Sequence, residues 1–442
     1  MIRPIFTLIF ASIPWTAALT PGVGAAAVYY VDASAGSDNA AGNSPDSPWR
    51  SLTKAGQTPL QPGDYVLLKR GETWYERLQI SSSGAPDTPV TFGAYGAGQR
   101  PVLDGSRMTL SASLIAASGV TGIAISGLAV RNATRHGMTF SNSSGLSFRD
   151  LEVSGSQQHG IIVFDSERIT IEDSEIFGNS LDLSNSYDGI RIDGTARRPL
   201  ESFIVRNCRI YQNVGGAGWK SGNGIFLGHT GSNTPELRKV HIAANDVDEN
   251  GNPNQNQAGR GITGTFDGDV RLTGNRIRRN ASAGVYLGDL GSKLDISIVN
   301  NYFYNNALRQ FGGFTETTAL GEGNTLVVDD PWITAMGIEI GGGGTWKLTG
   351  NVFCYTTNTE DRFRGFVRIF TPEQDSRLVS DRNIFFSEGP RRWLRSDGTF
   401  LNFRQWQAAG YDGSSKSLES GLDVLGEGAK QNGKGYGASA AR

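Results

Sequence analysis

Residues of chemical interest recur at one position of a repeated sequence that runs from Leu151 to Phe303. Each copy has a variable residue, then Gly, then an apolar residue. The copies are His159-Gly160-Ile161, Asp188-Gly189-Ile190, Asn223-Gly224-Ile225, Arg260-Gly261-Ile262 and Ala283-Gly284-Val285. The first residue changes between acid, amide and base, whereas the Gly and the apolar character remain. A variable position within a constant repeat indicates a functional surface on a repetitive scaffold.

A second row of variable residues follows from the alternation of side chains along a strand. With Ile190 and Ile192 facing the interior, Arg191 and Asp193 face outward. The same register continues the outward row with Phe226, Thr263, Tyr286, Glu339 and Val367. Aromatic rings can stack on sugar rings, and charged groups can bind sugar carboxylates and hydroxyls. We therefore predict a sugar-binding cleft with these substrate-binding residues: Trp219, Asn223, Phe226, Tyr286 and Glu339.

Two carboxylates of the repeat, Asp188 and Asp193, lie on neighbouring parts of one turn. Carboxylate oxygens are ligands that Ca²⁺ prefers, so both residues are candidate metal ligands. As a pair they could instead act as acid and base in glycoside hydrolysis. The structural alternative is hydrogen bonding within the corner for Asp188 and a surface position for Asp193.

The candidate catalytic residues are basic. Arg191 and Arg260 could neutralise a uronate carboxylate and so stabilise the charge that develops when the neighbouring C–H is deprotonated. The alternative for each is a solvated face or a salt bridge to the next turn. Lys220, which follows Trp219 in a Gly-rich loop, and His229, at the cleft edge, are the candidate bases. Their alternatives are an ordinary loop lysine and a structural histidine.

Stacked strands are the elements that would align these residues. One apolar residue per repeat forms a column: Val130, Val153, Ile176, Ile210, Val247, Ile277, Phe303, Phe353 and Phe385. Asn recurs two residues before this column, at Asn245, Asn275, Asn301, Asn351 and Asn383, and three residues after it, at Asn179, Asn213, Asn250, Asn280 and Asn306. Asn tolerates left-handed turns, and its amide can bond to the same amide of the next strand. His136 and His159 share the corner column, where we expect them to stack.

The repeat length is irregular, from about 23 to about 37 residues with one interval of about 50. Irregular intervals fit a parallel β-helix with variable corner loops, whereas helical repeats and propellers keep tighter periods. The inserts 180–187, 214–222, 251–259 and 307–335 all fall at the corner before the Gly, so their loops would wall the cleft. We predict an all-β solenoid of about ten turns with an N-terminal helical cap.

The ends of the chain differ from the repeat. Residues 1–27 have the charged, apolar and small-residue regions of a signal peptide, with a retained N-terminal anchor as the alternative. No later segment is long enough to span a membrane, so we expect a secreted or periplasmic protein and a monomer. The predicted division is 1–27 signal peptide, 28–117 N-terminal cap and first turns, 118–390 parallel β-helix, 391–425 C-terminal cap and 426–442 disordered tail.

Composition limits the partners and the redox chemistry. The chain of 442 residues has a net charge of −2 and a pI near 6.2, which gives no support for nucleic-acid binding. An anionic polysaccharide needs only a local basic cleft. Cys208 and Cys354 fall about four turns, or roughly 19 Å, apart at the strand spacing of a sheet. This separation exceeds the reach of a disulfide, so we expect two free, buried thiols.

These repeats resemble the right-handed parallel β-helix superfamily, which has the pectate-lyase-like fold. The opening is similar to that of secreted bacterial members at Tyr29-Tyr30-Val31-Asp32, Pro48-Trp49, Pro62-Gly63-Asp64 and Ala94-Tyr95-Gly96. The resemblance covers roughly residues 28–425 and implies a right-handed solenoid. It does not imply one activity, because this fold carries lyases, hydrolases, epimerases, esterases and non-catalytic surface proteins.

A local likeness points to the ninth polysaccharide-lyase family. Asn185-Ser186-Tyr187-Asp188-Gly189 is similar to the calcium-binding stretch Asn-Ser-Asp-Asp-Gly of that family. Asn223-Gly224-Ile225-Phe226-Leu227-Gly228 is similar to its Asn-Gly-Phe-Lys-Leu-Gly stretch, but Phe226 stands at the position of the catalytic lysine. The family mechanism therefore does not transfer directly, and Lys220 is the nearby substitute.

These observations predict a secreted carbohydrate-active enzyme, a lyase that cleaves a uronate-containing polysaccharide by β-elimination. Arg191, Arg260 or a calcium ion near Asp188 and Asp193 would neutralise the carboxylate. A glycoside hydrolase that uses Asp188, Asp193 or Glu339 is the second hypothesis. A non-catalytic glycan-binding or envelope matrix protein is the third.

Overall fold

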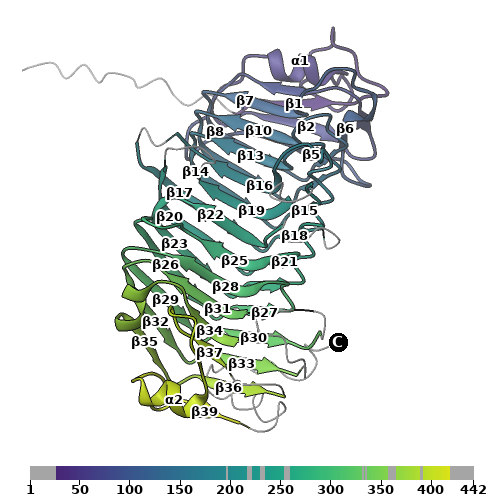
Figure 1. Cartoon of the computed structure of the whole chain (residues 1–442). Coiled ribbons are helices and arrows are strands. Elements are labelled where there is room, and N and C mark those ends of the chain that lie inside the picture. The colour runs from purple at the N-terminus through teal and green to yellow at the C-terminus, as the bar shows by residue number, and fades with distance from the viewer. Residues whose placement is uncertain are drawn as a thin grey trace, which may run out of the picture.

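Three long parallel sheets run along the whole described chain and form one elongated solenoid (Figure 1). The computed structural model describes residues 26–195, 198–216, 222–228, 234–252, 259–330, 333, 336–356, 365–388 and 392–418. Each sheet has 13 strands within these residues. Each regular turn contributes one strand to each sheet, so the predicted all-β, right-handed parallel β-helix is confirmed.

The strands of each sheet follow one another from the N-terminal to the C-terminal end of the solenoid. Sheet A contains β1 (Val28–Val31), β2 (Tyr65–Lys69), β5 (Val90–Tyr95), β8 (Thr121–Ser126), β11 (Ser144–Arg149), β14 (Glu167–Glu172), β17 (Leu200–Arg206), β20 (Glu236–Ala243), β23 (Asp267–Thr273), β26 (Leu294–Val299), β29 (Thr318–Glu322), β32 (Thr345–Thr349) and β35 (Leu378–Asp381). Sheet B contains β3 (Thr73–Trp74), β6 (Val102–Asp104), β9 (Ala129–Arg131), β12 (Glu152–Ser154), β15 (Glu175–Phe177), β18 (Arg209–Tyr211), β21 (Asp246–Asp248), β24 (Arg276–Arg278), β27 (Tyr302–Tyr304), β30 (Thr325–Val328), β33 (Val352–Tyr355), β36 (Ile384–Ser387) and β39 (Lys416–Ser417).

Sheet C carries the repeated Gly motif. It contains β4 (Leu78–Ile80), β7 (Ile115–Ser118), β10 (Met138–Ser141), β13 (Ile161–Phe164), β16 (Tyr187–Asp193), β19 (Gly222–Gly228), β22 (Ile262–Thr265), β25 (Ala283–Leu287), β28 (Arg309–Phe314), β31 (Met336–Gly341), β34 (Gly365–Ile369), β37 (Trp393–Leu394) and β38 (Phe400–Leu401). A Cβ at Gly160, Gly224 or Gly261 would lie 2.6 Å from a carbonyl oxygen of the next turn. The repeated Gly therefore allows the turns to stack closely at this corner.

Short helices lie near the two ends of the described chain. In α1 (Leu52–Gln57), Ser51 is the N-cap and its Oγ accepts from the Lys54 N–H at 3.0 Å. The helix packs beside β4, and its role as a cap stays a prediction. Near the C-terminal end, α2 (Phe403–Ala408) begins with a capping box at Asn402, and two 3₁₀ turns complete the helical elements, η1 (Gly105–Arg107) and η2 (Pro372–Ser376). Within the described residues, no helix is long and apolar enough to cross a membrane.

The predicted apolar column lies in sheet B and is confirmed strand by strand. Val130 pairs with Val153, and the pairing continues to Phe353 and Phe385 at the C-terminal end. The column also contains Leu326, which pairs with both Phe303 and Phe353. Each of these side chains is fully buried. They form the continuous core of the solenoid.

One prediction about the turns is wrong. The segment 307–335 is not a corner loop, because it contains β28, β29 and β30, which make a complete turn. Further turns at the N-terminal end also raise the number above the expected ten. The interval of about 50 residues between Phe303 and Phe353 therefore contains two turns of the solenoid.

Buried Asn side chains form two hydrogen-bonded ladders along the solenoid. In the first, each Nδ2 donates to the Oδ1 of the next turn, from Asn245 through Asn275, Asn301, Asn324 and Asn351 to Asn383. The second joins Asn179, Asn213, Asn250, Asn280 and Asn306, and it ends on Gln310.

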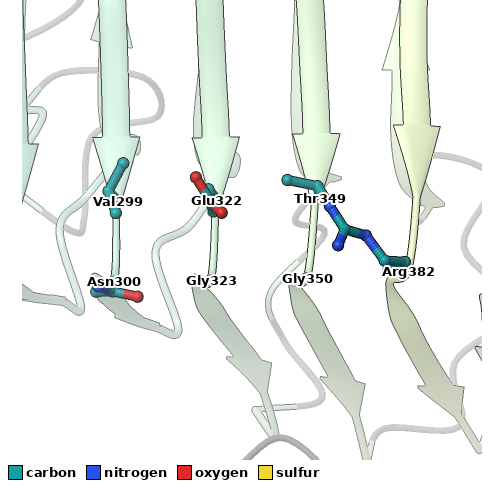
Figure 2. Close-up of a pocket in the computed structure, with 7 residues that line it drawn as sticks. All are labelled: Val299, Asn300, Glu322, Gly323, Thr349, Gly350 and Arg382. Atoms are coloured by element: carbon teal, nitrogen blue, oxygen red, sulfur yellow. The ribbon is translucent and has the colours of Figure 1, made fainter. Parts of the chain in front are cut away.

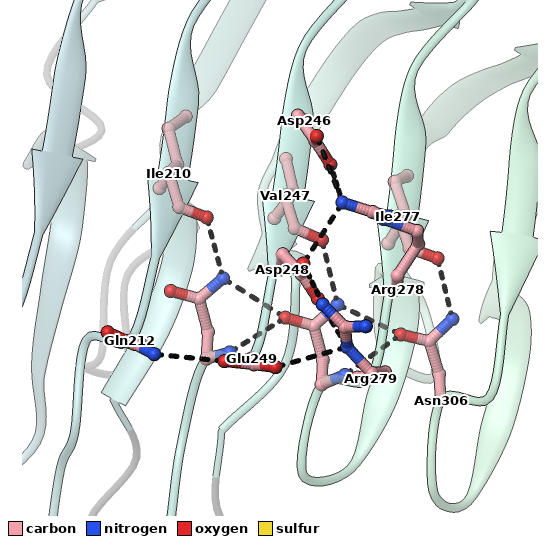
Figure 3. A network of polar contacts seen from close by, with 12 residues as sticks. Ile210, Gln212, Asp246, Val247, Asp248, Glu249, Ile277, Arg278, Arg279 and Asn306 are labelled. Carbon is pink, nitrogen blue, oxygen red and sulfur yellow. Dashed lines mark hydrogen bonds and ion pairs between the residues drawn. The ribbon is translucent and has the colours of Figure 1, made fainter. Parts of the chain in front are cut away.

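Figure 3 shows part of the second ladder, where Asn306 Nδ2 also donates to the Ile277 carbonyl at 2.9 Å. Asn250, Asn280 and Asn306 each donate to a backbone carbonyl of the preceding turn as well as to the side-chain oxygen of the next ladder residue. On the outer side of the same strands, Arg278 bonds to Asp246 and Asp248. Polar contacts therefore tie successive turns together on both sides of the sheet B backbone.

Removal of one ladder amide should destabilise the protein. In Asn280→Ala, the Nδ2 of Asn250 and the carbonyl of Val247 lose buried partners. We expect the free energy of unfolding to fall by about 3 kcal/mol, since each unsatisfied buried group costs roughly 1–3 kcal/mol. Denaturant unfolding measures the change. Asn39→Ala, at an exposed position, is the control and should stay within about 0.5 kcal/mol. Equal unfolding midpoints for the two variants would contradict a structural role of the ladder.

Candidate active site

The candidate site is a row of outward-facing residues on sheet C. The strand register pairs Arg191 with Phe226, Phe226 with Thr263, and Thr263 with Tyr286. The row continues through Gly312 and Glu339 to Arg368. The predicted outward row is correct except at its end. Val367 is fully buried, because it pairs with the interior residue Ile338, and Arg368 takes the outward place.

One end of the row is a buried ionic cluster around Arg191. Its Nη1 donates to Asp188 Oδ2 at 3.1 Å, and its Nε donates to Asp193 Oδ2 at 2.8 Å. The side chains are only 6%, 1% and 8% exposed, respectively. The guanidinium also lies over the ring of Phe226, 4.2 Å from its centroid. Tyr187 to Asp193 form one strand, which holds both carboxylates on either side of the arginine.

Neighbouring groups set the protonation of this cluster. Burial raises the pKa of Asp188, whereas Arg191 and the amide of Asn223 lower it. That amide donates to Asp188 Oδ1 at 2.7 Å. Burial alone would lower the pKa of Arg191, but Asp188 and Asp193 raise it above its ordinary value. The arginine therefore remains charged between its two carboxylates.

Calcium binding at Asp188 and Asp193 was predicted from the sequence. In the structure, a guanidinium occupies the space between the two carboxylates, and the oxygens face hydrogen-bond donors. Ca²⁺ needs six to eight oxygen ligands. Among the described residues, no group of three or more His, Cys, Asp or Glu could hold a metal ion. This arrangement does not fit calcium, and a calcium requirement stays an untested prediction.

His136 and His159 stack in the corner column beside the cluster, with ring centroids 5.1 Å apart. Burial, together with Arg135 and Arg191, lowers the pKa of His136 to about 3. Burial also holds the pKa of His159 well below its usual value. His159 Nδ1 accepts the Asp188 backbone N–H at 2.9 Å. Both rings are therefore neutral at ordinary pH and stabilise the corner.

Arg260 differs from the other arginines of the row in the groups that surround its guanidinium. Its backbone N–H donates to Asn223 Oδ1 at 2.9 Å, and its Nη1 donates to Thr263 Oγ1 at 3.0 Å. The guanidinium lies 5.0 Å from the centroid of the Tyr286 ring. Burial and the nearby charge of Arg309 lower its pKa. Within the described part of the chain, no carboxylate lies within ion-pair distance of Arg260.

The other end of the row contains a second ionic group. Arg309 Nη1 and Arg368 Nη1 each lie 3.2 Å from a different oxygen of Glu339. Arg309 also lies over the Tyr286 ring, with its guanidinium carbon 4.7 Å from the ring centroid. The arginines are 21% and 36% exposed, whereas Arg191 is 6% exposed. The arginine side chains of the row are therefore more exposed to solvent near β28 and β34 than at β16.

Tyr286 lies between Arg260 and the group formed by Arg309, Glu339 and Arg368. Burial, and then the charge of Glu339, raise the pKa of its hydroxyl to about 12, although Arg309 and Arg260 oppose this shift. The hydroxyl remains protonated at neutral pH. Tyr286 can therefore donate a hydrogen bond or offer an aromatic surface, but it is poorly suited to act as a base.

The structure brings together six predicted site residues: Arg191, Asp188, Asp193, Asn223, Phe226 and Arg260. Tyr286 and Glu339 continue the row. Lys220, His229 and Trp219 lie outside the described residues, so their predicted roles stay predictions.

Sequence reasoning missed Arg309 and Arg368. Arg309 was missed because the turn formed by residues 309–328 was taken for a loop. Arg368 was missed because the outward position was assigned to the neighbouring Val367. A usable signal was present, since Gly323-Asn324-Thr325-Leu326 repeats the pattern of Gly274-Asn275-Arg276-Ile277. This pattern would have placed Arg309 at the start of a strand in sheet C.

The two thiols take no part in the row. Cys208 and Cys354 are buried and form no disulfide with each other, as predicted. Burial raises the pKa of each to about 12. Both thiols therefore stay protonated and act as small apolar side chains.

A groove of about 460 Å³ lies at the bend between sheets A and B (Figure 2). Its lining residues are Val299, Asn300, Glu322, Gly323, Thr349, Gly350 and Arg382. Figure 2 shows strand ends side by side at Val299, Glu322 and Thr349, with Arg382 reaching toward Thr349. No member of the sheet C row lines it, so this groove is separate from the candidate site.

Comparisons with known proteins agree with the fold. A family model described as Pel9A-like, right handed beta helix region, matches residues 29–234. A second model, described as right handed beta helix region, matches residues 136–353. The crystal structure of pectate lyase Pel9A is 17% identical, with a TM-score of 0.50 over 69% of this chain and 78% of that chain. At this identity the likeness concerns the fold alone.

Two further relatives are glycosidases by name. The GH136 lacto-N-biosidase from Eubacterium ramulus is 14% identical, with a TM-score of 0.36 over 89% of this chain and 67% of that chain. A lacto-N-biosidase of Bifidobacterium longum subsp. longum is 43% identical over 72 residues, which is 15% of this chain. The chain spans only 4% of the length of that curated relative.

Both family models describe right-handed β-helices, and together they extend from residue 29 to residue 353. The predicted likeness to the ninth polysaccharide-lyase family agrees with the Pel9A-like model. The chain therefore has a right-handed parallel β-helix, and it resembles the pectate-lyase-like superfamily of this fold.

Proposed function

We propose that the protein is an exported polysaccharide lyase, secreted or periplasmic, that cleaves a uronate-containing polysaccharide by β-elimination. The observation that carries the proposal is Arg260, a largely buried cation without a carboxylate partner in the described part of the chain. Burying a charge is costly unless it is paired. A uronate carboxylate bound beside Arg260 would supply the missing partner.

The chemistry of β-elimination uses such a cation directly. A base removes the C5 proton of the uronate, the electron pair forms a C4–C5 double bond, and the C4–O bond to the neighbouring sugar breaks. Negative charge builds up on the carboxylate side of C5 before the bond breaks. A fixed guanidinium stabilises this charge more in the transition state than in the ground state. Arg260 would fill this role, held by Thr263 and Tyr286.

The leaving oxygen needs a proton or a hydrogen bond. Tyr286 keeps its hydroxyl proton because its pKa is about 12, and the ring lies beside Arg260. We assign it the role of donor toward the leaving oxygen. The base that takes the C5 proton is Lys220 or His229, as proposed from the sequence. Arg191 positions Phe226 and the corner, because its charge is already neutralised by Asp188 and Asp193.

A glycoside hydrolase is the second candidate, and the local identity with lacto-N-biosidase favours it. A hydrolase needs two carboxyl groups that reach the scissile bond. Here Asp188 and Asp193 hold Arg191, and Glu339 is shared by two arginines. The carboxylates of the row therefore have cationic partners, whereas no carboxylate of the described residues lies within ion-pair distance of Arg260, which supports the lyase over the hydrolase.

The first prediction concerns the products. Purified protein incubated with a panel of uronate-containing and neutral glycans should raise both the ultraviolet absorbance of an unsaturated product and the number of reducing ends. Both signals should appear only with uronate-containing glycans, because elimination needs the carboxylate next to C5. Reducing ends without absorbance would identify a hydrolase. Intact glycans that remain bound would identify a matrix protein.

The second prediction concerns Arg260. Arg260→Ala should lower kcat/KM on the acidic glycan by about 10²–10³-fold, the range for loss of one transition-state donor. Arg260→Lys should recover part of this loss, because it restores the charge without the planar donor geometry. Arg271→Ala, an exposed arginine in β23 of sheet A, is the matched control. Equal kinetics for Arg260→Ala and Arg271→Ala would remove the basis of the proposal.

The third prediction concerns calcium, which is the alternative source of positive charge. We expect full activity in a chelator, because a guanidinium already lies between Asp188 and Asp193. Initial rates with and without chelator, followed by Ca²⁺ addition, test this point. Loss of activity with recovery on Ca²⁺ alone would transfer the charge-neutralising role from arginine to calcium.

A further inference from the structure

An aromatic column runs beside the charged end of the sheet C row. Side chains alternate along a strand, so Phe314 at the end of β28 and Phe370, which directly follows β34, face outward. The position between them belongs to Gly341 of β31, which pairs with Phe314. The Phe370 N–H donates to the Ile340 carbonyl at 2.8 Å, so the register of the sheet extends to Phe370. The column therefore contains Phe314, Gly341 and Phe370 on three neighbouring turns.

Gly341 leaves room for the Phe314 ring to extend across β31. A Cβ at Gly341 would lie 2.3 Å from Phe314 Cε1, a distance that van der Waals repulsion forbids. The Phe314 ring meets the Phe370 ring with centroids 5.1 Å apart and planes at 78°, which is the edge-to-face arrangement that aromatic pairs favour. Phe314 is only 4% exposed, so it supports the ring of Phe370 from a packed position.

Phe370 keeps a large exposed surface although two neighbours fix its orientation. The Arg368 guanidinium lies over its ring, 5.1 Å from the centroid, and Phe314 contacts it from β28. Even so, 44% of Phe370 is exposed. A single exposed apolar side chain needs no explanation by itself, but a ring with a fixed orientation beside a candidate site is prepared for a ligand. Little side-chain entropy is lost when a ligand binds to such a ring.

A sugar ring suits the combination of a fixed aromatic face and adjacent guanidiniums. The C–H groups of a pyranose contact the aromatic face, while its hydroxyl and carboxylate groups bind polar groups placed around it. Arg368 and Arg309 are such groups, and they share the single carboxylate of Glu339. Two cations and one anion leave a net positive charge beside Phe370, which complements an acidic glycan.

Phe370 is remote from the proposed reacting position but lies on the same row. Arg260 directly precedes β22, and four strand spacings separate β22 from β34 in sheet C. At about 4.8 Å for each spacing, the separation along the solenoid axis is roughly 19 Å. Tyr286 and Glu339 occupy outward positions of the strands between. A glycan bound at Arg260 therefore reaches Phe370 only if several further sugars extend along the row toward β34.

We propose that Phe370 forms a distal subsite on which a pyranose ring of the substrate glycan stacks, several sugars away from Arg260. This inference rests on the proposed function, since the stacked sugar belongs to the glycan that reacts at Arg260. The subsite is remote from the bonds that break, so it binds the substrate and the transition state equally. Its contribution therefore appears in KM and not in kcat, and only long glycans receive it.

The kinetic test combines chain length with substitution of Phe370. The probes are polygalacturonate, polymannuronate and hyaluronan, each as the polymer and as its trisaccharide, which is too short to extend from Arg260 to Phe370. Phe370→Leu keeps an apolar contact with Phe314 but removes the flat ring, and it should raise KM for a cleaved polymer about three- to tenfold with kcat unchanged. Phe370→Tyr should behave as the wild type. Tyr75→Ala, which removes an exposed ring with the Arg107 guanidinium 3.7 Å from its centroid, is the matched control and should leave KM unchanged.

The trisaccharides distinguish a distal subsite from a general effect on the enzyme. Phe370→Leu should cleave them at the wild-type kcat/KM, because they do not reach Phe370. An unchanged KM for every polymer, or an equal loss of kcat/KM on the trisaccharides, would overturn the subsite. If Phe370→Leu does not fold, Phe370→Ala is judged by the same outcomes.

Binding without reaction separates this inference from the proposed function. Affinity electrophoresis in gels that contain each polymer compares Arg260→Ala, in which elimination is slow, with the double variant Arg260→Ala/Phe370→Leu. The double variant should bind the polymer about three- to tenfold more weakly. Weaker binding together with absence of unsaturated product from the wild-type protein would overturn the lyase function but support the subsite. Equal retardation of the two variants would overturn the subsite alone, and absence of both binding and product with every probe would overturn both.

Discussion

Hydrogen bonding in strict register between stacked turns is the constraint on which the rest of the molecule depends. Each ladder Asn satisfies the next Asn and a backbone carbonyl at once, as Asn280 does with Asn306 and Val247. Such a buried amide is stable only if the next turn presents a partner at the same place. Additional residues can therefore be inserted into a turn only at positions outside these Asn columns. The length of the chain can vary at the corner before the repeated Gly, which lies between the second ladder and sheet C.

The same register decides how charges meet on the functional face. Outward residues of neighbouring strands stand only about 4.8 Å apart, so a row of identical charges would repel strongly. The chain avoids this by separating its arginines with Phe226, Tyr286 and Glu339. Aromatic rings accept the guanidiniums on their faces, at 4.2 Å for Arg191 and 5.0 Å for Arg260. The intervening side chains therefore keep like charges of the row from lying on adjacent strands.

The fold was largely predictable because its constraints repeat along the sequence. The apolar column and the two Asn columns are visible without a structure, and the register confirms them. Prediction failed at one turn, where Gln310-Phe311 stands at the position of the usual Gly-apolar pair and Gln310 ends the second Asn ladder. The error removed Arg309 from the predicted site. Side-chain pairing was less accessible to prediction, because the direction of a long side chain depends on neighbours in other turns. The cluster of Asp188, Arg191 and Asp193 is an example, since the sequence suggested a metal site between carboxylates that instead bind an arginine.

The two ends of the row differ in how they meet the cost of buried charge, and the proposed place of the chemistry rests on this difference. At β16 the cost is met within the protein, because Arg191 has two carboxylates and its pKa rises. Such a cluster gains little from a ligand, since binding would have to break existing ion pairs. At Arg260 no carboxylate of the residues that the structure describes forms an ion pair, and burial lowers the pKa of the guanidinium. Buried charges that lack an ion-pair partner destabilise a protein, and such perturbed charges are found mainly at functional sites. Arg260, rather than the most densely charged cluster, is therefore the position at which the proposed anionic substrate would gain the most from binding.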